Sequence, residues 1–168
     1  MALKIQGEIK VEAPRERVWT YLFDENRLKE MAAKVPGVTV ERLVKVSEDK
    51  YEGTATLGVA MIKGKYDGTI TVVEKRVPEF VKWHADGKNG ANWAGGDLSL
   101  TLLDQDGKTL MKYEGMGNVG GTLASVGQRL IDTVGKHFIQ YGTRALAEEL
   151  AATGNTSDEP ESNRTTPT

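Results

Sequence analysis

The chain has 168 residues, of which 39% are hydrophobic and 27% are charged, and its formal net charge is −2. This composition is that of an ordinary globular domain, and a slightly acidic chain gives no electrostatic reason to expect nucleic acid as a partner. Because cysteine is absent, disulfides, thiolate metal sites and cysteine nucleophiles are excluded. The sequence shows neither the apolar stretch of a signal peptide nor a run long enough to span a membrane, so we expect a cytoplasmic protein.

The N-terminal region predicts one strand followed by two short helices. Apolar residues alternate with polar ones from Ile5 to Val11, which is typical of a strand. After Pro14 the apolar residues recur at helical spacing, and a second short helix is expected over 27–34, ending before Pro36-Gly37.

The middle of the chain predicts six strands. Pairs of turn-forming residues separate short segments of strand-like alternation, so the strands should form an antiparallel meander. The expected strands are 38–47, 50–62, 65–77, 80–88, 92–104 and 108–119, with turns at 48–49, 63–64, 78–79, 89–90 and 106–107.

From about Thr122 to Leu150 the apolar period becomes helical. A long amphipathic helix must bury its apolar face, and the concave side of the sheet is the available partner. The predicted fold class is therefore α+β, with an antiparallel sheet of about seven strands wrapped around a long C-terminal helix and two short helices after the first strand. This domain would span 1–152, and the polar residues 153–168 are expected to form a disordered tail.

The alternation also predicts which residues point toward the helix, and many of them are small. A solid core is close-packed with larger side chains, so small residues on both facing surfaces indicate a cavity. A second interpretation is that glycines permit strong sheet coiling and a closer approach of the helix, and both can hold at once. The small residues are Gly53, Ala55, Gly68, Ala85, Ala94, Gly96, Gly115 and Gly117 on the sheet, with Gly127 on the helix.

Adaptable apolar and aromatic side chains lie beside these small residues, and such linings suit an apolar ligand. His137, at the edge of the helical stripe, would either hydrogen-bond a ligand's carbonyl or reach solvent at the rim. No metal-ligand cluster or catalytic set of residues is apparent, so we expect no catalytic residues. The predicted ligand-binding residues are Leu57, Val59, Met61, Tyr66, Ile70, Trp83, Met111, Tyr113, Gly127, Leu130, Val134, His137 and Phe138.

One motif imitates a dinucleotide-binding fingerprint. Residues 115–120 match GxGxxG between a strand and a helix. No second parallel strand can follow, however, and Gln140, some twenty residues on, is not acidic. We expect these glycines to open the cavity rather than to bind a phosphate.

Four segments carry a family resemblance: 13–19 (Ala-Pro-Arg-Glu-Arg-Val-Trp), 35–37 (Val-Pro-Gly), 51–74 and 120–127. In their order and spacing the chain resembles the CoxG-type family, named for the G subunit of carbon monoxide dehydrogenase, within the helix-grip START/Bet v 1 (SRPBCC) superfamily. The resemblance implies a helix-grip fold and a role beside molybdenum-containing CO dehydrogenases or related hydroxylases. Family members are associated with enzyme maturation, membrane attachment of the enzyme and binding of a lipophilic quinone.

The predicted function is non-catalytic binding of a quinone (such as menaquinone) or a lipid, with no covalent cofactor, as an accessory protein to such an enzyme. The implied partners are a hydrophobic small molecule, the molybdenum hydroxylase or CO dehydrogenase complex, and the inner face of the cell membrane. Two alternatives stay open. One is a polyketide cyclase/aromatase-like enzyme that uses Tyr51, Tyr66, Tyr113 and His137 as polar groups, and the other is a maturation or docking scaffold with an incidental cavity.

Overall fold

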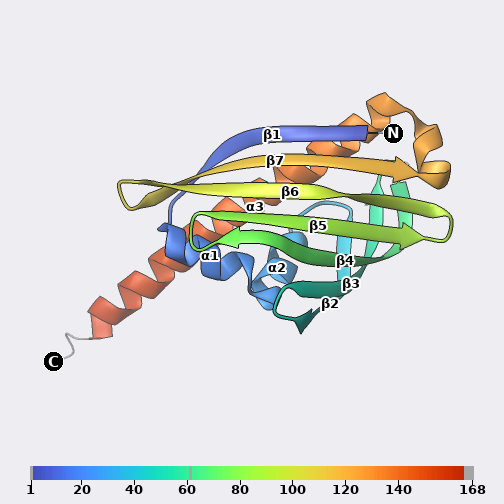
Figure 1. Cartoon of the computed structure of the whole chain (residues 1–168). Coiled ribbons are helices and arrows are strands. Elements are labelled where there is room, and N and C mark those ends of the chain that lie inside the picture. Colours follow the sequence, from blue (N-terminus) through green and yellow to red (C-terminus); the bar gives the residue numbers. More distant parts are fainter. Residues whose placement is uncertain (1, 61, 165–168) are drawn as a thin grey trace.

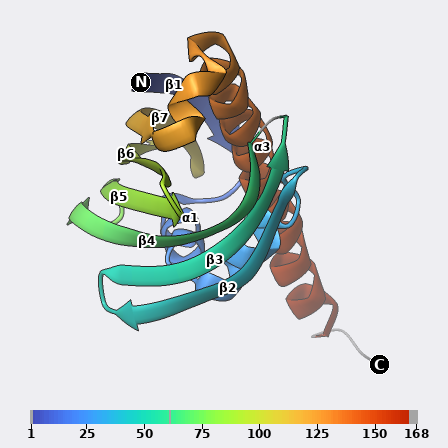
Figure 2. The same cartoon turned by 90° about the vertical axis from the view of Figure 1, so that its right-hand side faces the viewer.

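A computed structural model describes the backbone of residues 2–60 and 62–164, and the side chains of residues 2–60 and 62–152. A curved antiparallel sheet lies against one long helix, α3 (Figure 1; Figure 2). The elements are β1 (Ala2–Val11), α1 (Arg15–Leu22), α2 (Glu25–Ala32), β2 (Val38–Ser47), β3 (Lys50–Val59), β4 (Ile62–Arg76), β5 (Phe80–Asn89), β6 (Asn92–Gln105), β7 (Lys108–Gly120), the 3₁₀ helix η1 (Gly121–Val126) and α3 (Gln128–Arg164). The predicted tail, 153–168, lies outside the residues described in full and stays a prediction.

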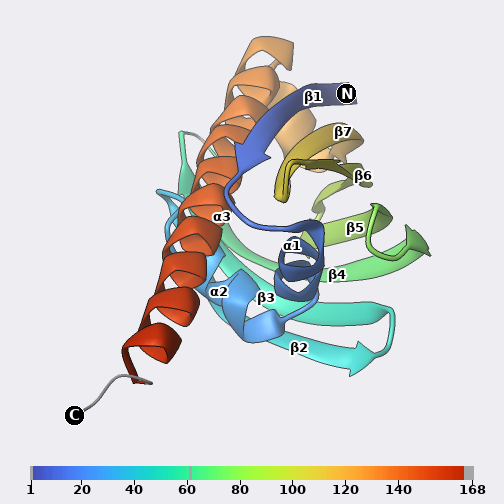
Figure 3. The same cartoon turned by 90° about the vertical axis from the view of Figure 1, so that its left-hand side faces the viewer.

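The sheet has seven strands in the order β1-β7-β6-β5-β4-β3-β2, and every neighbouring pair is antiparallel. The predicted meander of six consecutive strands is confirmed. The first strand adds to the far side of the last, with Ile5 opposite Gly115. This long-range pairing leaves β1 and β2 as the two edges of the sheet, and α3 runs beside β1 (Figure 3).

The two short helices follow β1, as predicted. The second begins at Glu25, two residues before the expected start, because Asp24 caps it. The Asp24 carboxylate accepts hydrogen bonds from the backbone N–H groups of Asn26, at 2.9 Å, and Arg27, at 3.2 Å. Such a cap satisfies donors that the first helical turn leaves free.

The long helix was expected to start near Thr122, but it starts at Gln128. Residues 121–126 form η1 instead, and Gly127, with φ +96°, separates it from α3. Asn92, at the β5–β6 hairpin, holds η1 in place, because its Oδ1 accepts from the Leu123 N–H (3.1 Å) and from the Thr122 hydroxyl. The prediction that Gly127 lies within the helical stripe is therefore wrong, since it occupies a break that needs a positive φ.

The hairpin between β3 and β4 also differs from the prediction. The expected turn at 63–64 is wrong, because Val59 pairs directly with Ile62 and the strands connect through residues 60–61. A turn at 63–64 would have turned Ile62 outward, whereas Ile62 is buried. Side chains alternate between the two faces of a strand, so the buried Ile62 belongs to β4 and not to the end of the preceding strand.

Candidate functional site

The inner face of the sheet is defined by the strand register, because directly opposed residues of antiparallel strands share a face. Gly53 lies opposite Gly68, and Gly68 lies opposite Gly87 on the next strand. Ala85 lies opposite Gly96 in the same way. The predicted inward positions are thus brought together. We call the small-residue band the set Gly53, Ala55, Gly68, Ala85, Gly87, Ala94, Gly96, Gly115 and Gly117.

Two apolar clusters fill opposite ends of the space between α3 and the sheet. The η1-end cluster contains Val59, Ile62, Tyr66, Leu123 and Val134, with Leu57, Val119, Val126, Leu130 and Phe138 packed against it. The α1-end cluster contains Val11, Ala13, Val18, Tyr21, Leu22, Val81, Leu100, Leu102, Met111, Leu146 and Leu150. Aromatic rings join α1 to the sheet there, with ring centroids 4.9 Å apart for Trp19 and Phe23 and 6.0 Å apart for Phe23 and Trp83.

The predicted ligand-binding residues are divided between these clusters. Six lie in or against the η1-end cluster: Leu57, Val59, Tyr66, Leu130, Val134 and Phe138. Three lie in or against the α1-end cluster, namely Trp83, Met111 and Tyr113. Gly127 lies at the helix break, Ile70 lies between the clusters, and Met61 lies outside the described residues.

Between the clusters the inner face is open to solvent. Ile70 points inward by register, opposite Tyr51 and Ala85. Even so, 37% of Ile70 is exposed, and Ala85 is exposed as well. A Cβ added to Gly87 would have only one neighbouring atom, the Asp67 carbonyl oxygen at 3.9 Å. Inward-facing residues with accessible surface indicate a hollow that water can enter.

Some glycines of the small-residue band are required by the packing of neighbouring strands in the sheet. A Cβ at Gly53 would lie 2.5 Å from the Arg42 carbonyl oxygen, and one at Gly68 would lie 2.7 Å from that of Asp86. These oxygens belong to neighbouring strands, so the two glycines permit a close approach of backbones in the coiled sheet. Both interpretations of the small residues therefore apply, each to different positions.

The helix contributes a glycine that sequence reasoning missed. Gly142 lies one turn after Phe138 and one turn before Leu146, on the face that α3 buries. No atom lies within 4 Å of a Cβ added to it, apart from its own helix and chain neighbours. Gly135, two turns earlier, is different, because a Cβ there would lie 2.7 Å from a methyl group of Leu3 on β1. Gly142 thus faces open space, and its mid-helix position was the available sequence signal.

Two of the four candidate polar groups near the hollow, Tyr51 and His137, are already engaged. The Tyr51 hydroxyl donates to the Phe23 carbonyl oxygen at 3.0 Å, and burial raises the pKa of Tyr51. His137 Nε2 lies 2.8 Å from the Pro36 carbonyl oxygen, which can only accept, so this nitrogen carries the proton. The His137 ring also packs near Tyr141, with centroids 4.8 Å apart. Tyr66 differs, because burial raises its pKa and no hydrogen bond is made to its hydroxyl within 2–60 and 62–152.

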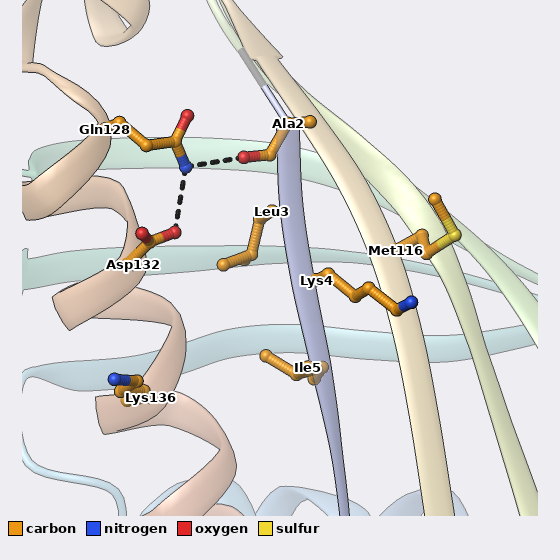
Figure 4. Close-up of a pocket in the computed structure, with 8 residues that line it drawn as sticks. All are labelled: Ala2, Leu3, Lys4, Ile5, Met116, Gln128, Asp132 and Lys136. Atoms are coloured by element: carbon orange, nitrogen blue, oxygen red, sulfur yellow. Dashed lines mark hydrogen bonds between the residues drawn. The ribbon is translucent and has the colours of Figure 1, made fainter.

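A separate groove runs between β1 and α3, which the sequence did not predict. Its larger part has a volume of about 720 Å³, with Ile5, Ile9 and Tyr113 from the sheet and Ile139 and Ala147 from α3 among its apolar lining residues. Its smaller part, about 380 Å³, lies near the N-terminal end of α3 (Figure 4).

Gln128 lines the smaller part of the groove and bridges its two sides. Its side-chain amide donates to the Ala2 carbonyl oxygen at 2.7 Å and to the Asp132 carboxylate at 2.8 Å (Figure 4). The amide thereby fastens the start of α3 to the edge strand β1.

A profile of the carbon monoxide dehydrogenase G-subunit (CoxG) family matches residues 7–151. The chain belongs to the CoxG family. A conserved protein from Geobacillus kaustophilus is similar in structure, with a TM-score of 0.80, 28% identity, and coverage of 91% of this chain and 97% of that one. Among curated proteins, none matches this sequence.

More distant structures share the fold alone. A START superfamily protein from Mycobacterium smegmatis has a TM-score of 0.64 at 9% identity, covering 89% of this chain and 98% of its own. A norcoclaurine synthase point mutant from Thalictrum flavum, in complex with a transition-state analogue, has a TM-score of 0.64 at 13% identity, covering 92% and 97%. The CoxG-family chain therefore has the START/Bet v 1-like fold, whose members include an enzyme.

Two features of this CoxG-family protein bear on its partners. Within the described residues, no helix combines the length and apolarity that crossing a bilayer requires. The same part of the chain holds no group of three or more histidine, aspartate or glutamate side chains placed to bind a metal ion.

His84 lies on the outer face of the sheet and forms an ionic cluster there. Its Nδ1 lies 2.8 Å from an Asp97 carboxylate oxygen and its Nε2 lies 3.1 Å from one of Asp86. The hydrogen bond to Asp97 raises the pKa of His84, and the charge of Asp86 adds to this. A raised pKa means that protonated His84 stabilises the fold fully below its ordinary pKa, near 6.5, and that this contribution is lost as pH rises through the folded-state value.

The cluster gives a pH-dependent prediction. Between pH 5.5 and 8.5 the melting temperature of the His84→Gln variant should change less than that of the original protein, because the variant lacks the titrating group. Thermal denaturation at both pH values, with the same buffer series and ionic strength, measures the difference. Identical pH dependence in the two proteins would show that the cluster does not stabilise the fold.

Proposed function

We propose that this protein binds a small apolar molecule, a quinone or a lipid, in the hollow between α3 and the small-residue band. In this role it would be a non-catalytic accessory protein of a molybdenum-containing CO dehydrogenase or a related hydroxylase, in the cytoplasm or at the inner membrane surface. The observation that carries the proposal is the accessible inner face, where Ile70 and Ala85 keep exposed surface. Gly142, between the two clusters along α3, likewise has no atom within 4 Å of an added Cβ.

Energetics support a carrier role. Burying roughly 200 Å² of apolar ligand surface supplies about 5 kcal/mol before the costs of association. Both apolar clusters can extend the contact, since Phe138 and Trp83 are only partly buried. Affinity of this order suits a protein that has to release its ligand to a partner.

The disposition of polar groups favours binding over catalysis. A cyclase-like enzyme on this fold needs free acids or bases aimed at the substrate. The Tyr51 hydroxyl and His137 Nε2 are engaged with the backbone carbonyls of Phe23 and Pro36, so two of the four polar groups that such an enzyme would use are taken. The name of the CoxG family, which refers to carbon monoxide dehydrogenase, is the support for a CO dehydrogenase partner.

Native mass spectrometry of the purified protein tests the proposal. We expect a discrete excess mass that organic solvent extracts, and a molecule that chromatography with mass detection assigns as apolar. The refolded or delipidated protein should take the extracted molecule up again. A folded protein that purifies without any such molecule and takes up neither a quinone nor a lipid would contradict the proposal, and would favour the scaffold alternative if it still captures the enzyme.

A further inference from the structure

Tyr66 occupies the boundary between the η1-end cluster and the hollow. It lies on the inner face of β4, opposite Ala55, and only 9% of the residue is exposed. Its ring packs in the cluster that contains Val59 and Val134. Along the same face the next inward residue is Gly68, whose neighbours on the adjacent strands are Gly53 and Gly87. The row of the inner face directly beside Tyr66 therefore carries no side chain, and the next row begins with Ile70.

The hydroxyl of this tyrosine has no partner within 2–60 and 62–152, where nothing accepts from it or donates to it. Tyr51, on the same face, donates to the Phe23 carbonyl oxygen at 3.0 Å, and Tyr21 donates to that of Arg27 at 3.2 Å. In the same residues no fully enclosed side-chain oxygen or nitrogen lacks a hydrogen bond. The Tyr66 hydroxyl therefore keeps some accessible surface although its ring is buried, and it borders open space.

Burial without a hydrogen bond has a chemical consequence. Desolvation is the cause of the raised pKa of Tyr66, so the hydroxyl stays protonated at physiological pH. Because residues 2–60 and 62–152 provide no acceptor for this hydroxyl, an acceptor oxygen on the ligand would form a hydrogen bond that the unbound protein lacks. If an apolar group covered it instead, the hydrogen bond would stay unmade and binding would be weaker.

We propose that the Tyr66 hydroxyl donates a hydrogen bond to an acceptor oxygen at one end of the ligand, so that this end lies against the η1-end cluster and the apolar remainder lies over the small-residue band toward Ile70. This inference rests on the proposed function and narrows the ligand to an apolar molecule that ends in a carbonyl-type acceptor. A bare hydrocarbon of the same shape should be discriminated against, because it would leave the tyrosine donor unpaired.

Two probes of matched shape test this assignment: 2-methyl-1,4-naphthoquinone, which carries two carbonyl oxygens, and 2-methylnaphthalene, which carries none. Dissociation constants come from calorimetric titration of the full, delipidated chain. Tyr66→Phe should weaken binding of the quinone about tenfold, the equivalent of one hydrogen bond. Binding of the hydrocarbon should be unchanged or tighter.

Tyr51→Phe is the matched control, because it removes a hydroxyl from the same face that is already paired. It should leave the preference for the quinone intact. If Tyr66→Phe binds both probes as the original protein does, the assignment of Tyr66 is overturned while the proposed function stands. If the original protein binds neither probe, the role of Tyr66 fails; if it also takes up no lipid, the proposed function fails as well.

Discussion

Replacing Gly142 by leucine should abolish ligand binding and make the protein more stable. The side chain would enter the hollow opposite the small-residue band, where no atom now lies within 4 Å of the place that its Cβ would take. We expect affinity for 2-methyl-1,4-naphthoquinone to fall by roughly 100-fold or more, because filling a site excludes its occupant. Leucine also favours a helix over glycine by about 1 kcal/mol, which raises the melting temperature by about 2–4 °C.

Gly135→Leu is the control for this substitution. It makes the same chemical change in the same helix, yet a Cβ at Gly135 would meet the Leu3 side chain at 2.7 Å. This variant should therefore lose stability, since an added side chain in a packed position forces its neighbours apart. Calorimetric titration and thermal denaturation of both variants give the comparison. If Gly142→Leu bound the quinone normally, or if it melted below the original protein, Gly142 would not face a hollow.

Leu102→Ala should have the largest effect on stability. Leu102 is fully buried in the α1-end cluster, opposite Met111, and its neighbour Leu103 is 38% exposed on the other face of β6. Truncating a fully buried leucine costs about 3–4 kcal/mol, whereas Leu103→Ala should cost less than about 1 kcal/mol.

Urea unfolding of the two leucine variants measures this difference directly. In thermal denaturation, the melting temperature of Leu102→Ala should fall by about 10 °C. Equal effects at the two positions would contradict the strand register, and with it the assignment of every residue to the inner face.

The residues of the inner face could be predicted from the sequence because apolar and polar residues alternate along each strand, and this alternation is a local signal. Once Tyr66 and Gly68 are assigned to one face of a strand, the rest of that strand follows, and antiparallel pairing carries the pattern to Gly53 and Gly87. The six-strand meander was predictable for the same reason, since short turns join the strands that pair.

Long-range contacts explain what the sequence could not predict. The contact between Asn92 and residues 122–123 holds η1 as a separate element, and nothing near position 122 signals it. The pairing of β1 with β7 likewise joins the two ends of the domain. The β1–α3 groove depends on this pairing, so it was missed as well.

The glycine on the helix shows how a correct argument can select the wrong residue. Facing small residues did predict a hollow, but Gly127 was chosen because the helix was expected to begin at Thr122. The mid-helix position of Gly142 was a signal, but it did not single this residue out, because Gly135 lies in the same helix and packs against Leu3. Only the placement of β1 tells the two helical glycines apart.

A crystal structure of the protein, purified without extraction of any bound molecule, tests the central claim most directly. We predict elongated density between Gly68 and Gly142, with one end within hydrogen-bonding distance of the Tyr66 hydroxyl. Direct van der Waals contact between Gly142 and the small-residue band, with no room left for a ligand, would contradict it.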